Sequence, residues 1–276
     1  MRKYIIVIGD SRKVLKRIKN NSVHLVVTSP PYWFLERYSQ QEGDLSRIDD
    51  REEFFNELSN VWKECHRILV PGGYLICEFE DIPIGSTIVG FPREICIVGD
   101  MVNSIEKSGL YLIARLIWKK FKAGAALTKF QYLLYGNLKN GKYDPRFCAN
   151  FAYVFVFKKE GERRVERDFT ESEWKEWADG VWYIENPVSK EESESIAGGS
   201  VFPVELIKRL IKIYTKPGDI VLDPFLGTGT TMKAAFELKR KCIGIEVRKE
   251  MLPIIKKKVG FGNQDLTEEV KWEVIE

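Results

Sequence analysis

The clearest local pattern in this 276-residue chain is Val221-Leu222-Asp223-Pro224-Phe225-Leu226-Gly227-Thr228-Gly229-Thr230-Thr231. An apolar strand ends in an acidic residue, and a glycine-rich turn then opens a helical stretch from Met232 to Lys239. In sheets that carry helices on both faces, small ligands bind where the carboxyl ends of strands meet the amino ends of helices. The segment therefore predicts an α/β fold with a small-ligand site at this turn.

Apolar runs with strand character recur along the chain, and helical patterns separate most of them. The seven runs are Tyr4–Ile8, His24–Thr28, Gly73–Phe79, Tyr111–Trp118, Phe151–Phe157, Asp219–Leu222 and Lys241–Ile245. Strands that alternate with helices indicate a mostly parallel, doubly wound sheet. Residues 33–50 and 158–200 fit neither pattern, and unstructured spans of that length are usually functional loops or a small extra module.

A second unusual segment, Thr28-Ser29-Pro30-Pro31-Tyr32-Trp33, directly follows the apolar run His24-Leu25-Val26-Val27. Consecutive prolines lack backbone donors and fix φ, so the chain leaves the strand as a stiff turn with an aromatic ring at its tip. A serine hydroxyl, a proline carbonyl and a tyrosine face suit a planar base that carries an exocyclic amine. The alternative is that the two prolines simply end a buried strand.

Together, the two segments resemble the amino-methyltransferase family that modifies DNA at cytosine N4 or adenine N6 with S-adenosylmethionine. The order of the segments, Ser29 before Gly227, resembles the permuted beta group of that family, and serine at position 29 resembles its N4-cytosine members. The resemblance implies a class I methyltransferase fold with a seven-stranded, mostly parallel sheet. Tyr111–Trp118 and Phe151–Phe157 would then form an antiparallel hairpin, and 219–245 would fill the middle of the sheet.

The resemblance also implies a cofactor site at three strand ends. Asp223 and the glycine turn would approach the methionine part of S-adenosylmethionine, Glu246 would accept the ribose hydroxyls, and Asp10 would lie on the adenine side. Phe202-Pro203 would pack on the methionine part, although glycine and serine replace the histidine that many members carry ahead of it. The full expected set is Asp10, Ser200, Phe202, Pro203, Asp223, Phe225, Gly227, Gly229, Thr230, Thr231 and Glu246.

The implied catalytic residues are Ser29, Pro30, Pro31 and Tyr32. An exocyclic amine is a poor nucleophile because its lone pair conjugates with the ring. The Ser29 hydroxyl and the Pro30 carbonyl would accept its two hydrogens, which concentrates the lone pair on nitrogen for in-line attack on the sulfonium methyl group. Tyr32 would stack on the flipped-out base. This displacement requires neither a metal nor a covalent intermediate.

Binding to nucleic acid is expected from clusters of basic residues, because a net charge of +3 is too small to indicate it. Ile117-Trp118-Lys119-Lys120 resembles an Ile-Trp-x-Lys segment of the family, so Lys119, Lys120 and Lys122 would flank the target cleft. Other clusters, at 139–146 and 163–167, are alternatives, although such clusters are more often solvated faces. Acidic stretches at 171–179 and 191–194 would repel phosphate if they faced it.

Composition argues against several other classes of enzyme. The five cysteines have no metal spacing and none follows a proline, which argues against C5-cytosine methyltransferases because those enzymes need a Pro-Cys thiolate. With two histidines in the chain, we expect no catalytic metal. No apolar run approaches 18 residues and no secretory segment precedes the first strand, so we expect a cytoplasmic protein without a membrane partner.

The expected organisation has three parts. Residues 1–157 would form the catalytic half of the methyltransferase domain, and 201–276 its cofactor-binding half. Residues 158–200 would form a connector with a small target-recognition region.

Three functions remain open at this point. The first is methyl transfer to cytosine N4 in double-stranded DNA, as part of a restriction-modification system. The second is the same chemistry on adenine N6 or on a cytidine in RNA, and serine at position 29 argues against adenine because those members usually carry Asp or Asn there. The third is a catalytically silent nucleic-acid-binding module, which the intact segments argue against. The sequence leaves both a monomer and a homodimer open.

Overall fold

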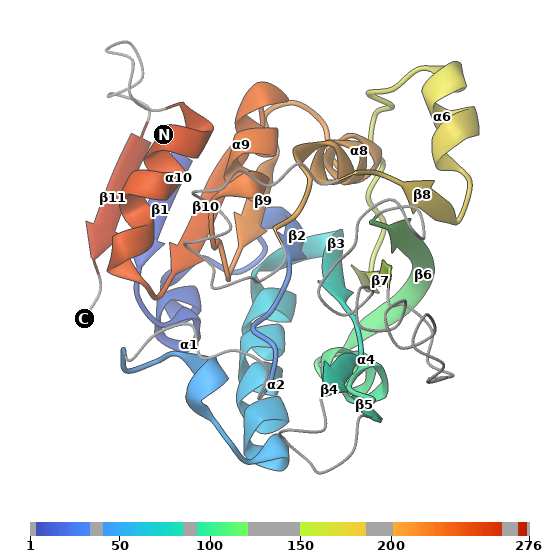
Figure 1. Ribbon diagram of the computed structural model, residues 1–276. Coiled ribbons are helices and arrows are strands. Elements are labelled where there is room, and N and C mark those ends of the chain that lie inside the picture. Colours follow the sequence, from blue (N-terminus) through green and yellow to red (C-terminus); the bar gives the residue numbers. More distant parts are fainter. Residues whose placement is uncertain are drawn as a thin grey trace, which may run out of the picture.

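The computed structural model describes residues 4–33, 41–84, 93–120, 150–185, 201–260 and 270–274, and they form one large mixed sheet with helices on both faces (Figure 1). The sheet has the order β11-β1-β10-β9-β2-β3-β7-β6-β8. Its strands are β1 (Tyr4–Ile8), β2 (Val23–Thr28), β3 (Leu69–Phe79), β6 (Leu110–Lys119), β7 (Phe151–Lys159), β8 (Val181–Tyr183), β9 (Ile220–Asp223), β10 (Lys241–Glu246) and β11 (Val270–Val274).

The expected fold class is confirmed. The seven expected strands form the contiguous middle of the sheet, β1-β10-β9-β2-β3-β7-β6, and β7 runs antiparallel to both of its neighbours, β3 and β6. Strands β9 and β10 come from the last third of the chain and lie inside the sheet, between β1 and β2, as the permuted order requires. Two short edge strands, β8 and β11, extend the sheet beyond the expected seven.

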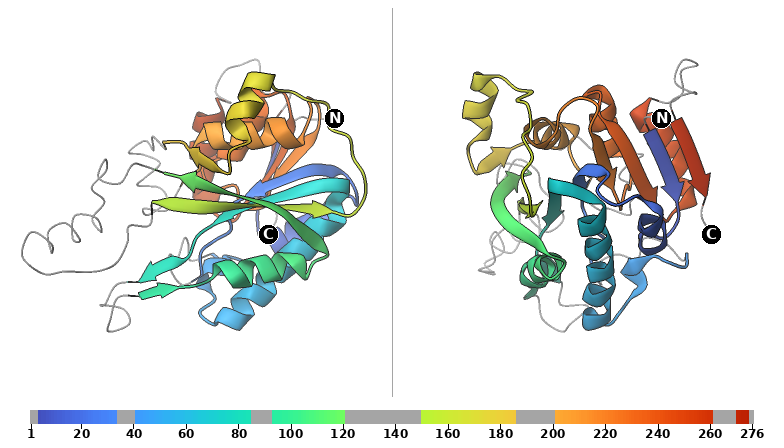
Figure 2. Two further views of the ribbon diagram at one scale, coloured as in Figure 1. Left: turned by 90° about the vertical axis from the view of Figure 1, so that its right-hand side faces the viewer. Right: turned by 180° about the vertical axis from the view of Figure 1, so that it is seen from behind.

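Helices cover the two faces of the sheet as separate layers (Figure 2). On one face α1 (Ser11–Val14), α2 (Arg51–Ile68) and α4 (Val98–Glu106) share a core with Val7, Val26 and Leu75 of the sheet. On the other face α8 (Val204–Tyr214), α9 (Thr230–Glu237) and α10 (Leu252–Val259) pack on Ile6, Leu25 and Val27. Adjacent strand residues therefore alternate between the two cores, as a sheet covered on both faces requires.

Sequence signals explain where the helices begin and which side they bury. The Asp50 side chain accepts the Glu53 amide of α2 at 2.8 Å, and a capping box between Thr170 and Glu173 opens α6 (Glu171–Trp177). In α8 the buried residues are Leu206, Ile207, Leu210 and Ile211, one turn apart on a single side.

The connector after β7 crosses toward α8 and rejoins the sheet at its edge. Arg163 forms an ion pair with Asp219, and Asp168 pairs at 2.6 Å with the buried Arg240, which ties the connector to the start of β9 and β10. Trp177 of α6 is buried and lies beside the Arg209 guanidinium of α8 at 5.6 Å. The next strand, β8, pairs with β6, so this part of the connector belongs to the main sheet.

Within the described ranges no helix is long and apolar enough to cross a membrane, and no three His, Cys, Asp or Glu side chains gather as a metal site. Cys65, Cys77 and Cys242 are free and buried, whereas Cys96 is exposed.

Candidate active site

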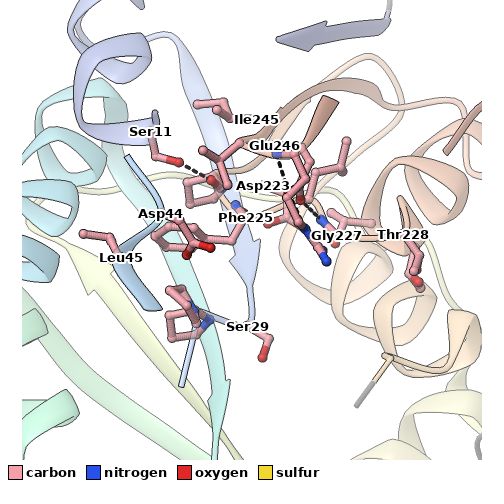
Figure 3. Close-up of a pocket in the computed structure, with 18 of the residues that line it drawn as sticks. Ser11, Ser29, Asp44, Leu45, Asp223, Phe225, Gly227, Thr228, Ile245 and Glu246 are labelled. Carbon is pink, nitrogen blue, oxygen red and sulfur yellow. Dashed lines mark hydrogen bonds and ion pairs between the residues drawn. The ribbon is translucent and has the colours of Figure 1, made fainter. Parts of the chain in front are cut away.

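A cleft lies at the carboxyl ends of four neighbouring parallel strands, β1, β10, β9 and β2 (Figure 3). It encloses about 990 Å³ of empty space, including its open mouth. Both segments singled out from the sequence line this cleft, together with residues 43–45 and Val201-Phe202. The Ser29 segment and the glycine turn meet because they follow β2 and β9, which are paired in parallel with Leu25 opposite Val221 and Val26 opposite Leu222.

Asp223 lies at the floor of the cleft, 3% exposed, at the end of β9. Its Oδ1 accepts the Thr28 hydroxyl at 2.8 Å and the Phe225 amide at 3.0 Å. Burial raises the pKa of this carboxyl to about 6, against the hydrogen bonds from threonine side chains that lower it. The hydrogen bond from Thr28 to Asp223 therefore joins the end of β2, just before Ser29, to the end of β9, just before the glycine turn.

Glu246, at the end of β10, is held on both of its oxygens. Oε2 accepts the Gly227 amide at 2.7 Å, and Oε1 accepts the Arg248 amide and its Nε, each at 3.0 Å. Burial raises the pKa of Glu246, while the Arg248 charge opposes that shift. In Figure 3 Glu246 and Gly227 lie on one side of the opening, across from Ser29. The carboxylate therefore fixes the glycine turn and still lines the cleft.

The two glycines of the turn differ in the space around them. Gly227 has φ +55°, and a Cβ at this position would meet no atom closer than 4.0 Å, so any side chain there would project into open space. Gly229, with φ +89°, caps α9, and a Cβ there would come within 3.0 Å of Ile255. The Thr230 hydroxyl next to it is buried in the cleft wall without a hydrogen-bond partner among the described residues.

Asp10 lies at the end of β1, where it caps α1. Its carboxylate accepts the Arg12 amide at 2.9 Å and forms an ion pair with the Arg12 guanidinium at 2.7 Å. Gly43, with φ +92°, passes so close that a Cβ there would lie 2.8 Å from the Asp10 Cβ. This contact brings Asp44 and Leu45 into the cleft wall.

The Ser29 segment forms the opposite wall. Ser29, Pro30, Pro31 and Tyr32 all line the cleft. Tyr32 is 9% exposed because one side of it packs on Ile82 and Ile97, next to the hairpin of β4 (Ile82–Ile84) and β5 (Arg93–Ile95). The apolar cluster behind the Tyr32 ring makes it a fixed part of the cleft wall.

A buried acid, Glu78, lies directly behind Ser29. Thr28, the last residue of β2, pairs with Cys77 of β3, so Ser29 just beyond the end of β2 follows the same register as Glu78. Glu78 is 2% exposed, and its Oε1 has no hydrogen-bond partner among the described residues. Burial raises its pKa to about 7, while the charge of Lys120 and a hydrogen bond from the Ser29 side chain lower it.

Most of the expected site residues meet in this cleft. Those that line it are Asp10, Ser29, Pro30, Pro31, Tyr32, Phe202, Asp223, Phe225, Gly227, Thr230, Thr231 and Glu246. Pro203 and Gly229 lie next to it as the caps of α8 and α9, outside the lining. Ser200 and Lys122 lie outside the described residues.

Two of the three lysines expected to contact DNA, Lys119 and Lys120, are described, and they differ in exposure and in ion pairing. Lys119 is exposed, whereas the Lys120 ammonium pairs with Glu80 at 2.7 Å and lies 5.3 Å from the Trp118 ring. Neither lines the cleft.

Several lining residues have no counterpart in the sequence prediction. Asp44 and Leu45 come from the stretch 33–50, for which the sequence predicts a functional loop or a small extra module but no particular site residue. Arg248 lines the cleft through its bonds to Glu246. Glu78, which lies behind the lining, has the same sequence signal as Asp223 and Glu246, since it is an acid near the carboxyl end of an apolar strand.

Known proteins with similar sequences identify the family of this chain. Residues 23–257 match the family N6_N4_Mtase, described as DNA methylases. The chain belongs to this DNA methylase family. Among relatives, it is 32% identical to the type II methyltransferase M.MjaI of Methanocaldococcus jannaschii, over 93% of this chain and 91% of that protein. M.MthZI of Methanothermobacter thermautotrophicus is 29% identical, over 89% of this chain and 74% of that protein.

Solved structures extend the comparison of this methylase to its fold. A Thermus thermophilus protein named as a putative DNA modification methylase, solved with S-adenosyl-L-methionine, superposes with a TM-score of 0.73 at 27% identity, over 99% of this chain and 98% of that one. The cytosine-N4-specific PvuII DNA methyltransferase has a TM-score of 0.70 at 20% identity, over 98% and 96% of the two chains, which bears on the fold alone.

The bond between Thr28 and Asp223 gives a testable prediction. Because the hydroxyl lowers the pKa of Asp223, Thr28→Val should raise that pKa above its value of about 6. Carboxyl NMR titration of the ligand-free protein measures the change. Thr170→Val, which removes a hydroxyl at the remote cap of α6, should leave the Asp223 titration where it is. An unchanged midpoint in Thr28→Val would contradict the contact.

Proposed function

We propose that this methylase transfers a methyl group from S-adenosylmethionine to cytosine N4 in double-stranded DNA, with the target base flipped out of the helix. The observation that carries the proposal is the meeting of the Ser29 wall and the Gly227 turn across one cleft. One side offers a small-ligand site at the strand ends, and the other offers acceptors for an amine. The reacting groups would thus be held face to face, which contributes much of the acceleration.

The cleft fits S-adenosylmethionine on three counts. The open space at Gly227 admits a ligand against the backbone, and the buried Thr230 hydroxyl has no partner among the described residues. Glu246 and Asp223 are buried acids whose raised pKa values a cationic ligand would lower. We assign the ribose hydroxyls to Glu246, which keeps lone pairs free beside its bonds to Gly227 and Arg248. When bound, S-adenosylmethionine supplies an electrophilic methyl group.

Ser29 and Pro30 would act on the target amine. Both residues line the cleft, and the Ser29 hydroxyl and the Pro30 carbonyl would accept the two hydrogens of the amine, which would draw its nitrogen toward tetrahedral geometry as it attacks. Tyr32 would offer one face to the base, while Ile82 and Ile97 hold the other side. A stacking contact of this kind stabilises a flipped base by about 1 to 3 kcal/mol.

Cytosine is preferred over adenine because a serine occupies position 29. Adenine N6 and cytidine N4 in RNA remain the alternatives to test. We assign target recognition to 158–200, but its described helix α6 carries Glu171, Glu173 and Glu176, a surface unsuited to phosphate. The Lys139–Arg146 cluster lies outside the described residues.

The product identifies the target directly. Incubation of the purified protein with S-adenosylmethionine and host DNA should yield N4-methylcytosine on nucleoside mass spectrometry. The control is Ser29→Ala, which should bind cofactor normally and lose most of the transfer, because its hydroxyl acts on the polarised amine. N6-methyladenine, or methylation of RNA alone, would overturn the N4-cytosine assignment.

Binding of the cofactor can be tested at Gly227. Gly227→Val should weaken S-adenosylmethionine by more than about 100-fold in calorimetry, because the side chain would fill the cleft. Gly218→Val is a matched control, since Gly218 also has a positive φ, +88°, with open space around it at the opposite end of β9. Equal affinities in the two variants would remove Gly227 from the cofactor site.

The two described lysines should differ in their contribution to DNA binding. Lys119→Gln should reduce the slope of log affinity against log salt by about one unit, because an exposed lysine can contact one phosphate. Lys120→Gln should leave the slope unchanged, since Glu80 already neutralises that charge. Fluorescence anisotropy across a salt series measures both. A flattened slope in the Lys120 variant only would reverse the assignment.

A further inference from the structure

A small apolar cluster backs the Tyr32 ring in the wall of the cleft. Its buried members are Ile82 and Ile97, and Phe55 and Ile95 pack at its margin. Ile82 begins β4 and Ile97 lies between β5 and α4, and the hairpin of β4 and β5 is separate from the main sheet (Figure 2). The position of the ring therefore depends on how this hairpin is held against the rest of the protein.

The peptide group that joins Cys96 to Ile97 is held on both of its polar atoms. The Cys96 carbonyl accepts a hydrogen bond from the Arg51 guanidinium at 2.5 Å. The Ile97 amide donates to Oδ1 of Asp81 at 2.8 Å, and the same oxygen accepts the Val98 amide at 3.0 Å. Rotation of this peptide group would break a hydrogen bond to a charged side chain on either side, and such bonds are stronger than those between neutral groups. The Ile97 side chain is thereby fixed behind the Tyr32 ring.

Asp81 ties the hairpin to the start of α4. The Ile97 and Val98 amides belong to the first turn of this helix, where backbone amides lack partners within the helix. An isoleucine side chain cannot cap them, so the carboxylate of Asp81, which directly precedes β4, does so from another part of the chain. A negative charge at a helix amino end is also favourable.

Arg51 ties the same hairpin to α2. It is the first residue of α2, and its Nε donates to Asp100, in the first turn of α4, at 2.9 Å. Its guanidinium also lies 5.7 Å from the ring of Trp33, whose indole donates to the Asp49 carbonyl at 3.0 Å. Arg51 therefore contacts both the residue that follows Tyr32 and the peptide group that supports the ring from behind.

We propose that Asp81 and Arg51 are positioning residues for capture of the target base. They hold the peptide group before Ile97 from its two sides and so keep the Tyr32 ring where a flipped base can stack on it. The inference rests on the proposed function, because it needs a base at Tyr32. In the part of the chain that the structure describes, neither residue lines the cleft, so both act through Ile97 and the ring.

A ring that is already fixed contributes more to binding than a mobile one, because no side-chain freedom is lost when the base arrives. Loss of either tie should therefore weaken capture of the base and leave the cofactor side of the cleft unchanged. The Arg51 and Asp100 side chains are exposed, and exposed ion pairs contribute little to the stability of a fold. Removing Arg51 should thus affect the ring more than the folding of the chain.

The first test compares Asp81→Ala, which removes the acceptor of both amides, with Asp81→Asn, which keeps one. In Asp81→Ala, kcat/KM for DNA should fall about fivefold or more, in line with loss of a stacked base. The fluorescence rise of a cytosine analogue at the target position should shrink with it, while calorimetry should give the S-adenosylmethionine affinity of the parent. Asp81→Asn should recover most of the activity. Ser108→Ala, which removes a side-chain bond to the Ile105 carbonyl at the other end of α4, is the matched control and should behave as the parent.

A double-mutant cycle separates positioning of the ring from a general structural role. Because Asp81 acts through the ring, Asp81→Ala should cause no further loss of kcat/KM in a Tyr32→Ala protein. If Asp81→Ala does not fold, Arg51→Gln gives the same test from the other side of the peptide group.

Equal losses with and without the Tyr32 ring, or normal kcat/KM in Asp81→Ala or in Arg51→Gln, would overturn the positioning role alone. Parent-like transfer by Tyr32→Ala would instead remove the stacking contact from the proposed function. A parent protein that methylates no DNA would overturn the proposed function itself.

Discussion

The parallel pairing of β2 with β9 is the constraint on which the candidate site depends. Thr28 and Asp223 lie 195 residues apart, and their 2.8 Å hydrogen bond at the carboxyl ends of these strands joins the two walls of the cleft. The pairing is enclosed by helices on both faces, so a change in register would move apolar side chains out of both cores. Sheet packing thereby fixes Ser29 opposite Gly227 without a direct bond between their segments.

Three buried acids lie in or behind the walls of the cleft: Asp223 and Glu246 line it, and Glu78 lies behind Ser29. Asp223, Glu246 and Glu78 each end or nearly end a parallel strand, and burial raises the pKa of each. Charging these groups in the ligand-free protein costs free energy, which a cationic ligand or transition state would offset. The same arrangement explains why the turns around them are rich in amide and hydroxyl donors, as at Phe225, Gly227 and Thr28.

The sequence predicted the fold class and most of the cleft because its signals are local. Each signal is a short, continuous pattern: an apolar strand followed by a glycine turn or by two prolines. Such a pattern determines the backbone conformation of a few neighbouring residues, so it can be recognised from the sequence alone. The contribution of Glu78 depends instead on the register of β3 against β2, and that of Asp44 on the close passage of Gly43 over Asp10. The sequence predicted Lys120 as a DNA contact because a local pattern does not show its ion-pair partner. That partner, Glu80, lies 40 residues away in the chain.

The most direct measurement is a crystal structure of the protein with a non-reactive analogue of S-adenosylmethionine and a DNA duplex that carries the target site. The account predicts that the ribose hydroxyls of the analogue lie at Glu246. It also predicts a flipped cytosine whose N4 lies within about 3 Å of both the Ser29 Oγ and the Pro30 carbonyl oxygen. A base amine that lies away from Ser29, or an analogue bound outside the Gly227 turn, would contradict the convergence of the two segments on one reaction.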